Sequence, residues 1–554
     1  MTLGLSSFFW FFESRKDPRN APLSIWINGG PGTSSLMGLL QENGPCFVNP
    51  DSNSTTLNPH SWNNEVNMLY IDQPVQAGYS YDVLRNGTLD LTSGDVVVGI
   101  DGFEEALPEQ NNTFLVGTFP SQELNRTSNT TVHAAHALWH FAQTWFAEFP
   151  VYKPEDDRVN IWTESYGGKY GPTFTAIFEE QNQKVLNGTT NGTYAYRIHL
   201  DTLGIVNGCI DGLIQGLSYP EMAFNNTYGI MAINKTVYKD SVNDYWKLGG
   251  CRDMILQCRN LTATYDPRDY GGVSVVNTAC KGATDYCEQT MAGPYEFISN
   301  RGMFDIAHPN HDPFPPPYLQ GFLNQHWVQK SLGVPVNHTL SSRAVARSFG
   351  STGDHCRGGQ LEDLKFILES GIKVALVYGD RDFICNWIGG EEVSLAVDYT
   401  FADNFRKAGY QSIEVNGSYV GGQVRQYGNF SFSRVYQAGH EVPAYQPATS
   451  YEIFMRSLSN RDISTGKTDV ADDYRTTGPS STWHIKNIVP DSPEPTCYIL
   501  APETCTKDQY ASVKNGTALV KDYIVRGGGE DMLINRPGGR EQQPVLGDGD
   551  TVAF

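Results

Sequence analysis

The stretch that most constrains the fold covers residues 159–172, V-N-I-W-T-E-S-Y-G-G-K-Y-G-P. Its first five residues include β-branched and aromatic side chains, which favour a short buried strand. Gly167 and Gly168 follow Ser165 almost directly, and glycines there let a helix leave close to that strand. Such a turn holds the Ser165 hydroxyl at the strand tip, near N–H groups that can bind an oxyanion. Because Thr163 replaces the first glycine of G-x-S-x-G, this stretch alone is equally consistent with an ordinary strand-to-helix turn.

Two later stretches favour a catalytic interpretation of Ser165. Residues 373–386 form an apolar strand with acidic residues at its end, and residues 430–443 deliver His440 in the same way. The order Ser, Asp, His is that of α/β-hydrolase triads, whose members lie on loops at the carboxyl edge of one sheet. We therefore expect Ser165 to be the nucleophile, His440 the general base and then acid, and Asp382 the group that orients the imidazole.

Four motifs in this order resemble the serine carboxypeptidase family, especially its fungal members, over nearly the whole chain. They are W-I-N-G-G-P-G-T-S-S, T-E-S-Y-G-G-K-Y-G-P, G-D-R-D-F-I-C-N-W and A-G-H-E-V-P. The resemblance implies an α/β-hydrolase fold, a central mostly parallel sheet flanked by helices, with a capping insertion. It also implies release of C-terminal amino acids from peptides and proteins through an acyl-enzyme. In this family the acid is the second Asp of G-D-x-D-F, so Asp382 is favoured and Asp380 is read as a turn-forming or solvated residue.

The resemblance also implies an oxyanion hole made by the backbone amides of Gly30 and Tyr166. The loop that contains Gly30, Gly29-Gly30-Pro31-Gly32, follows an apolar strand and permits close approach of backbone to a ligand. It is not a phosphate loop, because no Lys-Ser/Thr follows at the required spacing.

A further set of residues, by resemblance, binds the C-terminal carboxylate of the substrate. The members are Asn28, Gly29, Glu42 and Glu164. The two glutamates share a proton in the family, and a protonated acid can donate a hydrogen bond to the substrate carboxylate. This implies an exopeptidase favoured at acid pH, where the pair is not doubly ionised. Glu441, next to His440, is a possible subsite residue for a basic side chain or, alternatively, a solvated acid.

The cysteines and glycosylation signals indicate an oxidising, glycosylating route. The chain has ten cysteines and about fourteen N-x-S/T sequons, and we expect N-linked glycans and a secreted or vacuolar protein. No signal peptide is visible in residues 1–12, so we expect the N-terminus to be truncated relative to the family.

The cysteine spacings predict three local bridges and leave four residues. The expected bridges are Cys251 with Cys287, Cys258 with Cys280, and Cys497 with Cys505. For the first four cysteines the alternatives are another pairing or a C-x6-C…C-x6-C metal site. Of the other four, Cys356 is expected to pair with Cys46 and Cys209 has no obvious partner. By resemblance Cys385 is an unpaired thiol near the site, sensitive to mercurials; the alternative is an inert buried cysteine.

Charge and composition exclude several classes of function. The net charge of −21 argues against nucleic-acid binding, and no apolar run approaches the roughly 20 residues of a membrane span. We expect no cofactor and no metal. The cluster His133, His136 and His140 resembles a metal site, but no acid completes it at a ligand-like helical spacing.

The chain divides into four predicted parts. Residues 1–211 and 326–458 are the two parts of the α/β-hydrolase core, residues 212–325 are the cap insertion, and residues 459–554 are a polar C-terminal extension. Residues from Arg526 to the end read as disordered or loosely attached. Two alternatives to the carboxypeptidase remain: an acyltransferase or esterase on the same scaffold, and an inactive truncated fragment.

Overall fold

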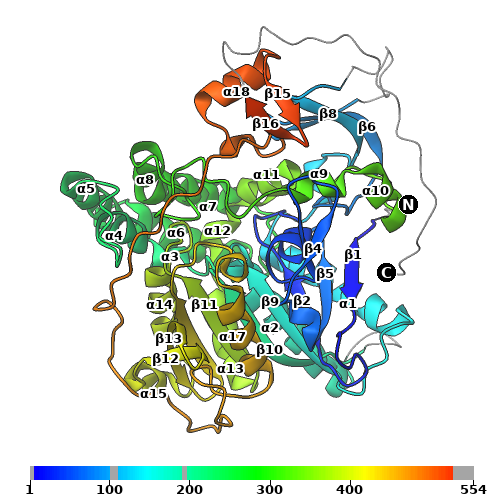
Figure 1. The fold of residues 1–554 in the computed structure, drawn as a ribbon. Coiled ribbons are helices and arrows are strands. Elements are labelled where there is room, and N and C mark those ends of the chain that lie inside the picture. Colours follow the sequence, from blue (N-terminus) through cyan, green and yellow to red (C-terminus); the bar gives the residue numbers. More distant parts are fainter. Residues whose placement is uncertain (1–4, 100–109, 190–195, 528–554) are drawn as a thin grey trace.

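The computed structural model describes residues 5–99, 110–189 and 196–527, and a nine-stranded sheet forms its centre (Figure 1). Across the sheet the strands are β1 (Phe9–Phe12), β5 (Asn67–Ile71), β2 (Leu23–Ile27), β9 (Arg158–Glu164), β10 (His199–Val206), β11 (Lys373–Gly379), β14 (Phe430–Val435), β13 (Tyr419–Tyr427) and β12 (Gln411–Asn416). The six strands from β5 to β14 run parallel, and β1, β13 and β12 are antiparallel to their neighbours. The expected mostly parallel sheet is confirmed.

Both faces of the sheet are covered, which explains why its central strands are continuous apolar runs. Ile25 and Ile161 point into one core, whereas Trp26 and Trp162 point into the other. The first core is closed by α1 (Thr131–Glu148), α2 (Gly167–Leu186), α13 (Gln360–Glu369), α14 (Trp387–Ala396) and α15 (Ala402–Lys407). The second is closed by the π-helix η1 (Gly38–Glu42), α9 (Leu319–Leu323), α10 (His326–Leu332), α16 (Val442–Tyr445) and α17 (Pro447–Leu458).

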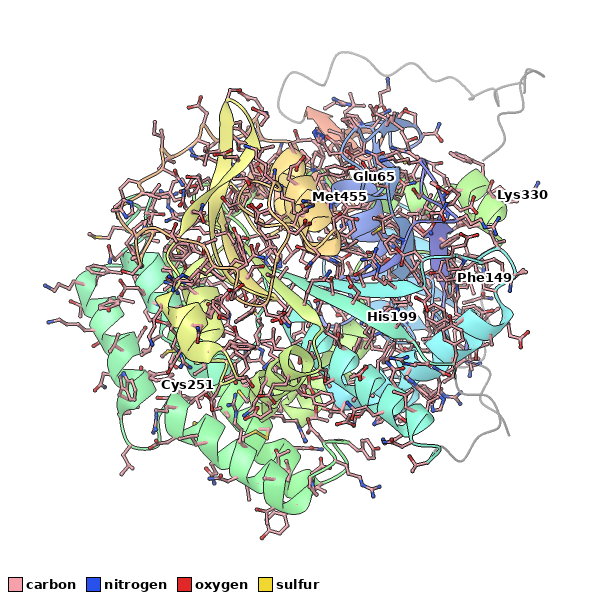
Figure 2. The ribbon with its side chains drawn as sticks, turned by 90° about the horizontal axis from the view of Figure 1, so that it is seen from below. Glu65, Phe149, His199, Cys251, Lys330 and Met455 are labelled. Carbon is pink, nitrogen blue, oxygen red and sulfur yellow. A yellow bond between two sulfur atoms is a disulfide. The ribbon has the colours of Figure 1, made fainter. Side chains whose placement is uncertain are left out.

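A group of helices between β10 and β11 lies over the carboxyl edge of the sheet, within the predicted cap range. They are α3 (Gly212–Gln215), α4 (Ser218–Phe224), α5 (Lys235–Trp246), α6 (Cys251–Tyr265), α7 (Ser274–Cys287) and α8 (Gly293–Ile298). Two further helices, α11 (Arg343–Thr352) and α12 (Asp354–Arg357), pack against α7 although they come from the range predicted as core. Disulfides Cys251–Cys287 and Cys258–Cys280 join α6 to α7, as predicted. Viewed from below, Cys251 and Phe149 lie toward opposite sides of the molecule (Figure 2).

The C-terminal extension ends in a small lobe with its own core. Cys497–Cys505, α18 (Lys507–Lys514), β15 (Leu519–Lys521) and β16 (Ile524–Gly527) pack against the small sheet of β6 (Arg85–Asp90), β7 (Val96–Val98) and β8 (Phe114–Phe119). The Cys497–Cys505 prediction is confirmed. Arg526 and Gly527 end β16, and the rest of the segment predicted to be disordered lies outside the described residues.

The predicted bridge between Cys46 and Cys356 is wrong, because both thiols are free. Cys46 begins the short strand β3 (Cys46–Val48), paired with β4 (Thr55–Leu57), and packs against the core that contains Trp26. Cys356 lies in α12 and packs in the cap core with the α6–α7 disulfides. The two residues belong to separate cores. Among the described residues, every helix is too short or too polar to cross a bilayer.

Candidate active site

Ser165 occupies the turn between β9 and α2 that the sequence predicted. Its φ angle is +64°, a left-handed conformation that is uncommon for a residue other than glycine. The Ser165 N–H donates to the Val206 carbonyl at 3.1 Å, and its carbonyl accepts from the N–H of Cys209 at 3.0 Å. A Cβ added to Gly168 would lie 2.7 Å from the Cys209 backbone nitrogen, so glycine is required where α2 passes this loop. The backbone is held on both sides in the strained turn of a nucleophile elbow.

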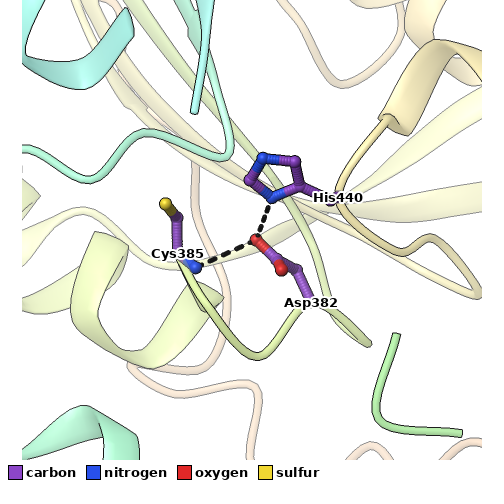
Figure 3. A group of neighbouring side chains, drawn as sticks. All are labelled: Asp382, Cys385 and His440. Atoms are coloured by element: carbon purple, nitrogen blue, oxygen red, sulfur yellow. Dashed lines mark hydrogen bonds and ion pairs between the residues drawn. The ribbon is translucent and has the colours of Figure 1, made fainter. Parts of the chain in front are cut away.

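Asp382 and His440 lie together at the ends of β11 and β14 (Figure 3). His440 Nδ1 is 2.8 Å from Asp382 Oδ2, which also accepts from Asn207 Nδ2 at 2.7 Å and from the Cys385 N–H at 3.2 Å. Asp382 Oδ1 accepts from the Ile384 N–H at 3.2 Å. With Nδ1 engaged by the carboxylate, Nε2 is the ring atom left to exchange a proton.

The backbone of the cap insertion contacts His440 directly. The Phe304 carbonyl accepts from the His440 N–H at 2.9 Å, and the two rings lie 5.0 Å apart between centroids. Phe304 is 58% exposed, so its ring lies at the protein surface beside the imidazole.

The Gly29-Gly30 loop presses against the elbow. A Cβ at Gly29 would lie 2.3 Å from the Tyr166 backbone nitrogen, and Gly30 has a φ of +105°. The Tyr166 ring is fixed by its hydroxyl, which donates to Asp354 at 2.5 Å. The two amides expected to form an oxyanion hole therefore lie in adjoining loops next to Ser165.

Ser165 opens onto a cavity of about 290 Å³ between the sheet edge and the cap. Gly30 and Tyr166 line the same cavity, and its far walls are mainly apolar. Those walls include Tyr219, Ile255, Met291, Phe349 and Ile384.

The expected carboxylate-binding residues are brought together beside the elbow. Asn28 Nδ2 donates to Glu164 Oε1 at 3.1 Å and to Glu42 Oε1 at 3.3 Å. The Asn28 carbonyl oxygen is held by Trp26 Nε1 at 2.7 Å and by the Gly38 N–H at 3.0 Å, so its amide group must face the two acids. Both glutamates are 1% exposed.

The electrostatics of this pair favour a retained proton. Burial raises the pKa of Glu42, and burial followed by the negative charge of Glu42 raises the pKa of Glu164 well above its usual range. The two carboxyl groups lie within hydrogen-bonding reach of each other, so one proton can link them. A third acid is close: Glu441 accepts from Gln41 Nε2 at 2.6 Å, and burial followed by the charge of Glu42 raises its pKa.

Two expectations about the Asp382 loop are wrong. Cys385 is not a free thiol, because its sulfur is bonded to Cys209. Cys209 follows β10 and Cys385 follows β11, and these neighbouring parallel strands bring the two residues to the same edge. Asp380 is neither solvated nor a simple turn residue: it is fully buried and paired with Arg434 at 3.1 Å.

Within residues 5–99, 110–189 and 196–527, two groups of side chains have the spacing of metal ligands, and each already has other bonding partners. Asp382, Cys385 and His440 form one group, but the Cys385 sulfur is in a disulfide and offers no thiolate. Asp305, His308 and Asp312 form the other, and Arg381 lies 2.6 Å from Asp305 Oδ2, in the place where a cation would compensate the acids.

Comparisons with known proteins identify the family and the fold of the chain. The sequence model described as serine carboxypeptidase matches residues 3–460. Carboxypeptidase S1 homolog A of Arthroderma otae is 55% identical over 547 residues, which cover 98% of this chain and 82% of that protein. A carboxypeptidase Y homolog of Arthroderma benhamiae is 46% identical over 527 residues, covering 94% and 83% respectively. A solved prohormone-processing carboxypeptidase of Saccharomyces cerevisiae shares the fold, with a TM-score of 0.57 and 23% identity over 86% of this chain and 90% of that one.

Proposed function

The chain belongs to the serine carboxypeptidase family and is a serine-type carboxypeptidase, and from this premise we propose that Ser165, Asp382 and His440 are its catalytic triad. The observation that carries the assignment is the meeting of three strand ends. The strained Ser165 turn, the buried Asp382 and the engaged Nδ1 of His440 come after β9, β11 and β14, three parallel strands of the same sheet. The proposal assigns each residue the role that its geometry permits.

In the proposed reaction Ser165 Oγ attacks the carbonyl of the last peptide bond while His440 Nε2 accepts its proton. His440 then gives this proton to the departing amine, and an acyl-enzyme remains on Ser165. Water enters and attacks the acyl group while His440 Nε2 removes a proton from it. His440 then gives this proton to the departing Ser165 Oγ, which releases the shortened peptide and restores the free enzyme. The amides of Gly30 and Tyr166 bind the oxyanion in both halves, and one such donor contributes about 10²- to 10³-fold in kcat.

Direction along the substrate would come from Asn28, Gly29, Glu42 and Glu164. A pair that keeps one proton can donate a hydrogen bond to a substrate carboxylate instead of repelling it. When rising pH removes that proton, two negative charges face the substrate carboxylate and binding is lost. The raised pKa values of both acids therefore support a preference for free C-termini at acid pH. Glu441 extends this acidic group, because it is a buried acid that accepts a hydrogen bond from Gln41. We propose that Glu441 lines the same subsite.

The test compares a blocked dipeptide that has a free C-terminal carboxylate with its C-terminal amide, across roughly pH 3 to 8. We expect the free acid to be hydrolysed best at acid pH, with the preference over the amide fading as pH rises. Equal cleavage of acid and amide, or reaction with esters alone, would replace this function by an esterase or acyltransferase. Failure of an organophosphonate to label Ser165 would point to an inactive chain.

We further propose passage through an oxidising, glycosylating compartment, which leads to secretion or to a vacuole. Four disulfides support this route. Several sequon asparagines are exposed and accessible to glycosylation, namely Asn86, Asn125, Asn187, Asn260 and Asn515. Treatment of the purified protein with an endoglycosidase, followed by mass measurement, tests the glycans.

A further inference from the structure

The buried pair of Asp380 and Arg434 lies directly behind the proposed triad. Asp380 is two residues before Asp382, and Arg434 is the last but one residue of β14, six residues before His440. Both side chains are fully buried, and Arg434 Nη2 is 3.1 Å from Asp380 Oδ2. A buried ion pair of this kind is tolerated only when further hydrogen bonds satisfy its remaining atoms.

A segment far along the chain supplies several of those hydrogen bonds. We call residues 482–488 the strap; they lie beyond residues 3–460, which the family comparison covers. Asn487 Nδ2 donates to Asp380 Oδ2 at 2.6 Å. Arg434 Nη1 donates to the Thr482 carbonyl at 2.8 Å and to its hydroxyl at 3.2 Å. In Figure 1 the chain that contains the strap runs along the outside of the molecule toward the C-terminal lobe.

The same pair is connected to the loop that carries His440. Asp380 Oδ1 accepts from the Gln437 N–H at 3.0 Å, three residues before His440, and from the Tyr228 hydroxyl at 2.6 Å. Gln437 Nε2 also donates to the Ile488 carbonyl of the strap at 2.8 Å. Gln437 has a φ of +55°, so its backbone needs such support to keep its conformation.

We call the residues that contact the pair its shell, and the strap supplies part of this shell. Thr227 Oγ1 accepts from Arg434 Nη2 at 2.8 Å, and the guanidinium stacks over Trp387 at 4.4 Å. The Trp387 ring in turn lies 5.2 Å from Trp483 of the strap. The strap therefore contacts the pair directly through Asn487 and Thr482. Its Trp483 ring contacts the pair only through Trp387.

We propose that Asn487 and Thr482 are positioning residues: by completing the shell of Asp380 and Arg434 they fix the two loops that present Asp382 and His440 to Ser165. The proposal rests on the triad assigned above. Without the Asn487 amide, one oxygen of Asp380 loses a donor, and the ends of β11 and β14 are free to shift relative to each other. Small misplacement of catalytic groups is costly, on the order of 10²-fold for about 1 Å.

The experiment measures kcat per titrated active site for the full chain and for three variants. An organophosphonate counts the reactive Ser165, so folded but misaligned enzyme is separated from unfolded enzyme. We expect Asn487→Ala to lower kcat about tenfold with KM changed less than about twofold, as loss of alignment predicts. The matched control is Lys486→Ala: Lys486 is next to Asn487 in the strap, but its ammonium lies over the Trp483 ring at 5.6 Å, and no hydrogen bond joins it to Asp380 or Arg434 in the described part of the chain. We expect this control to retain the wild-type kcat.

The third variant gives a readout that a merely structural role would not move. In Asn487→Asp the new carboxyl group can donate to Asp380 only while it is protonated. We therefore expect kcat per site close to that of the wild type at acid pH and a steeper loss as pH rises. Wild-type kcat per site in Asn487→Ala, with only a lower unfolding temperature, would overturn the proposal. Absence of Ser165 labelling in the wild type would instead overturn the triad.

Discussion

Two groups of buried carboxylates flank the elbow, and they are stabilised in opposite ways. Asp380 and Asp382 are fully buried, and each is matched by a cationic or imidazole partner and by several donors. Glu42 and Glu164 are equally buried, but their shared donor is the neutral amide of Asn28, and burial raises the pKa of both. The two groups differ in the charge of their partners: an arginine and an imidazole hold the aspartates, whereas a neutral amide is shared by the glutamates. The glutamates are therefore the pair between which a proton can be shared and lost as pH rises.

The largest effect is expected when the Asp382 carboxyl group beside His440 is replaced. Asp382→Asn keeps the size of the side chain but no longer holds the imidazole in the required tautomer, so kcat should fall about 10⁴-fold. Steady-state kinetics on a peptide substrate, normalised by phosphonate titration, measure this. A loss below about tenfold would show that the carboxylate only supports the fold.

A smaller effect is expected in the group that holds the proton. Glu164→Ala removes a donor to the substrate carboxylate and should lower kcat/KM for the free acid about 10- to 100-fold at acid pH, with little change for the amide. Glu164→Gln is the matched control: its amide donates at every pH, so the preference for the free acid should persist to higher pH. Equal pH profiles for Glu164→Gln and the wild type would contradict the shared proton.

The same protons make folding stability depend on pH. A carboxyl group whose pKa is raised in the folded state stabilises the protein below its unfolded pKa, and this contribution is lost as pH rises through the folded pKa. We expect the free energy of unfolding to fall from acid toward neutral pH, in denaturant titrations at several pH values. The double variant Glu42→Gln/Glu164→Gln should flatten this slope, and an unchanged slope would place its origin elsewhere.

The smallest effect concerns the disulfide at the end of the Asp382 loop. Because Cys385 is bonded to Cys209, a mercurial should change the activity of the oxidised enzyme less than about twofold. Cys209→Ala should free the Cys385 thiol and make the enzyme sensitive. Both measurements should be made on proteins that also carry Cys356→Ser, because Cys356 is a free thiol that lines the cavity onto which Ser165 opens. Strong inhibition of the oxidised enzyme in that background would contradict the bridge.

The sequence predicts much of this site because strand ends can be recognised locally. Ser165, Asp382 and His440 each follow an apolar run, and α/β-hydrolase logic places such ends at one edge. Asn207 was missed although it also follows an apolar strand, β10, because only the side-by-side position of β10 and β11 turns it toward Asp382. The Cys209–Cys385 bridge depends on the same adjacency across 176 residues.

The burial of Asp380 was missed for a related reason. A motif such as G-D-R-D-F does not reveal which distant segments cover it, and the partners of Asp380 come from β14, the cap and the strap. The separation between Asp380 and Asn487 is 107 residues, without any regular spacing to mark the pair. Local patterns locate chemistry, whereas the shell around it depends on strand order and on long connections.

The strap also gives the enzyme an order of assembly. A chain is made from its N-terminus, and its parts fold as they emerge from the ribosome. Ser165, Asp382 and His440 are all synthesised before residue 482, whereas Asn487 is made later. The partners that close the shell of Asp380 and Arg434 therefore arrive last. On this scheme a chain that has not yet been made as far as residue 487 lacks its aligned triad, and the enzyme reaches full activity only after that residue is in place.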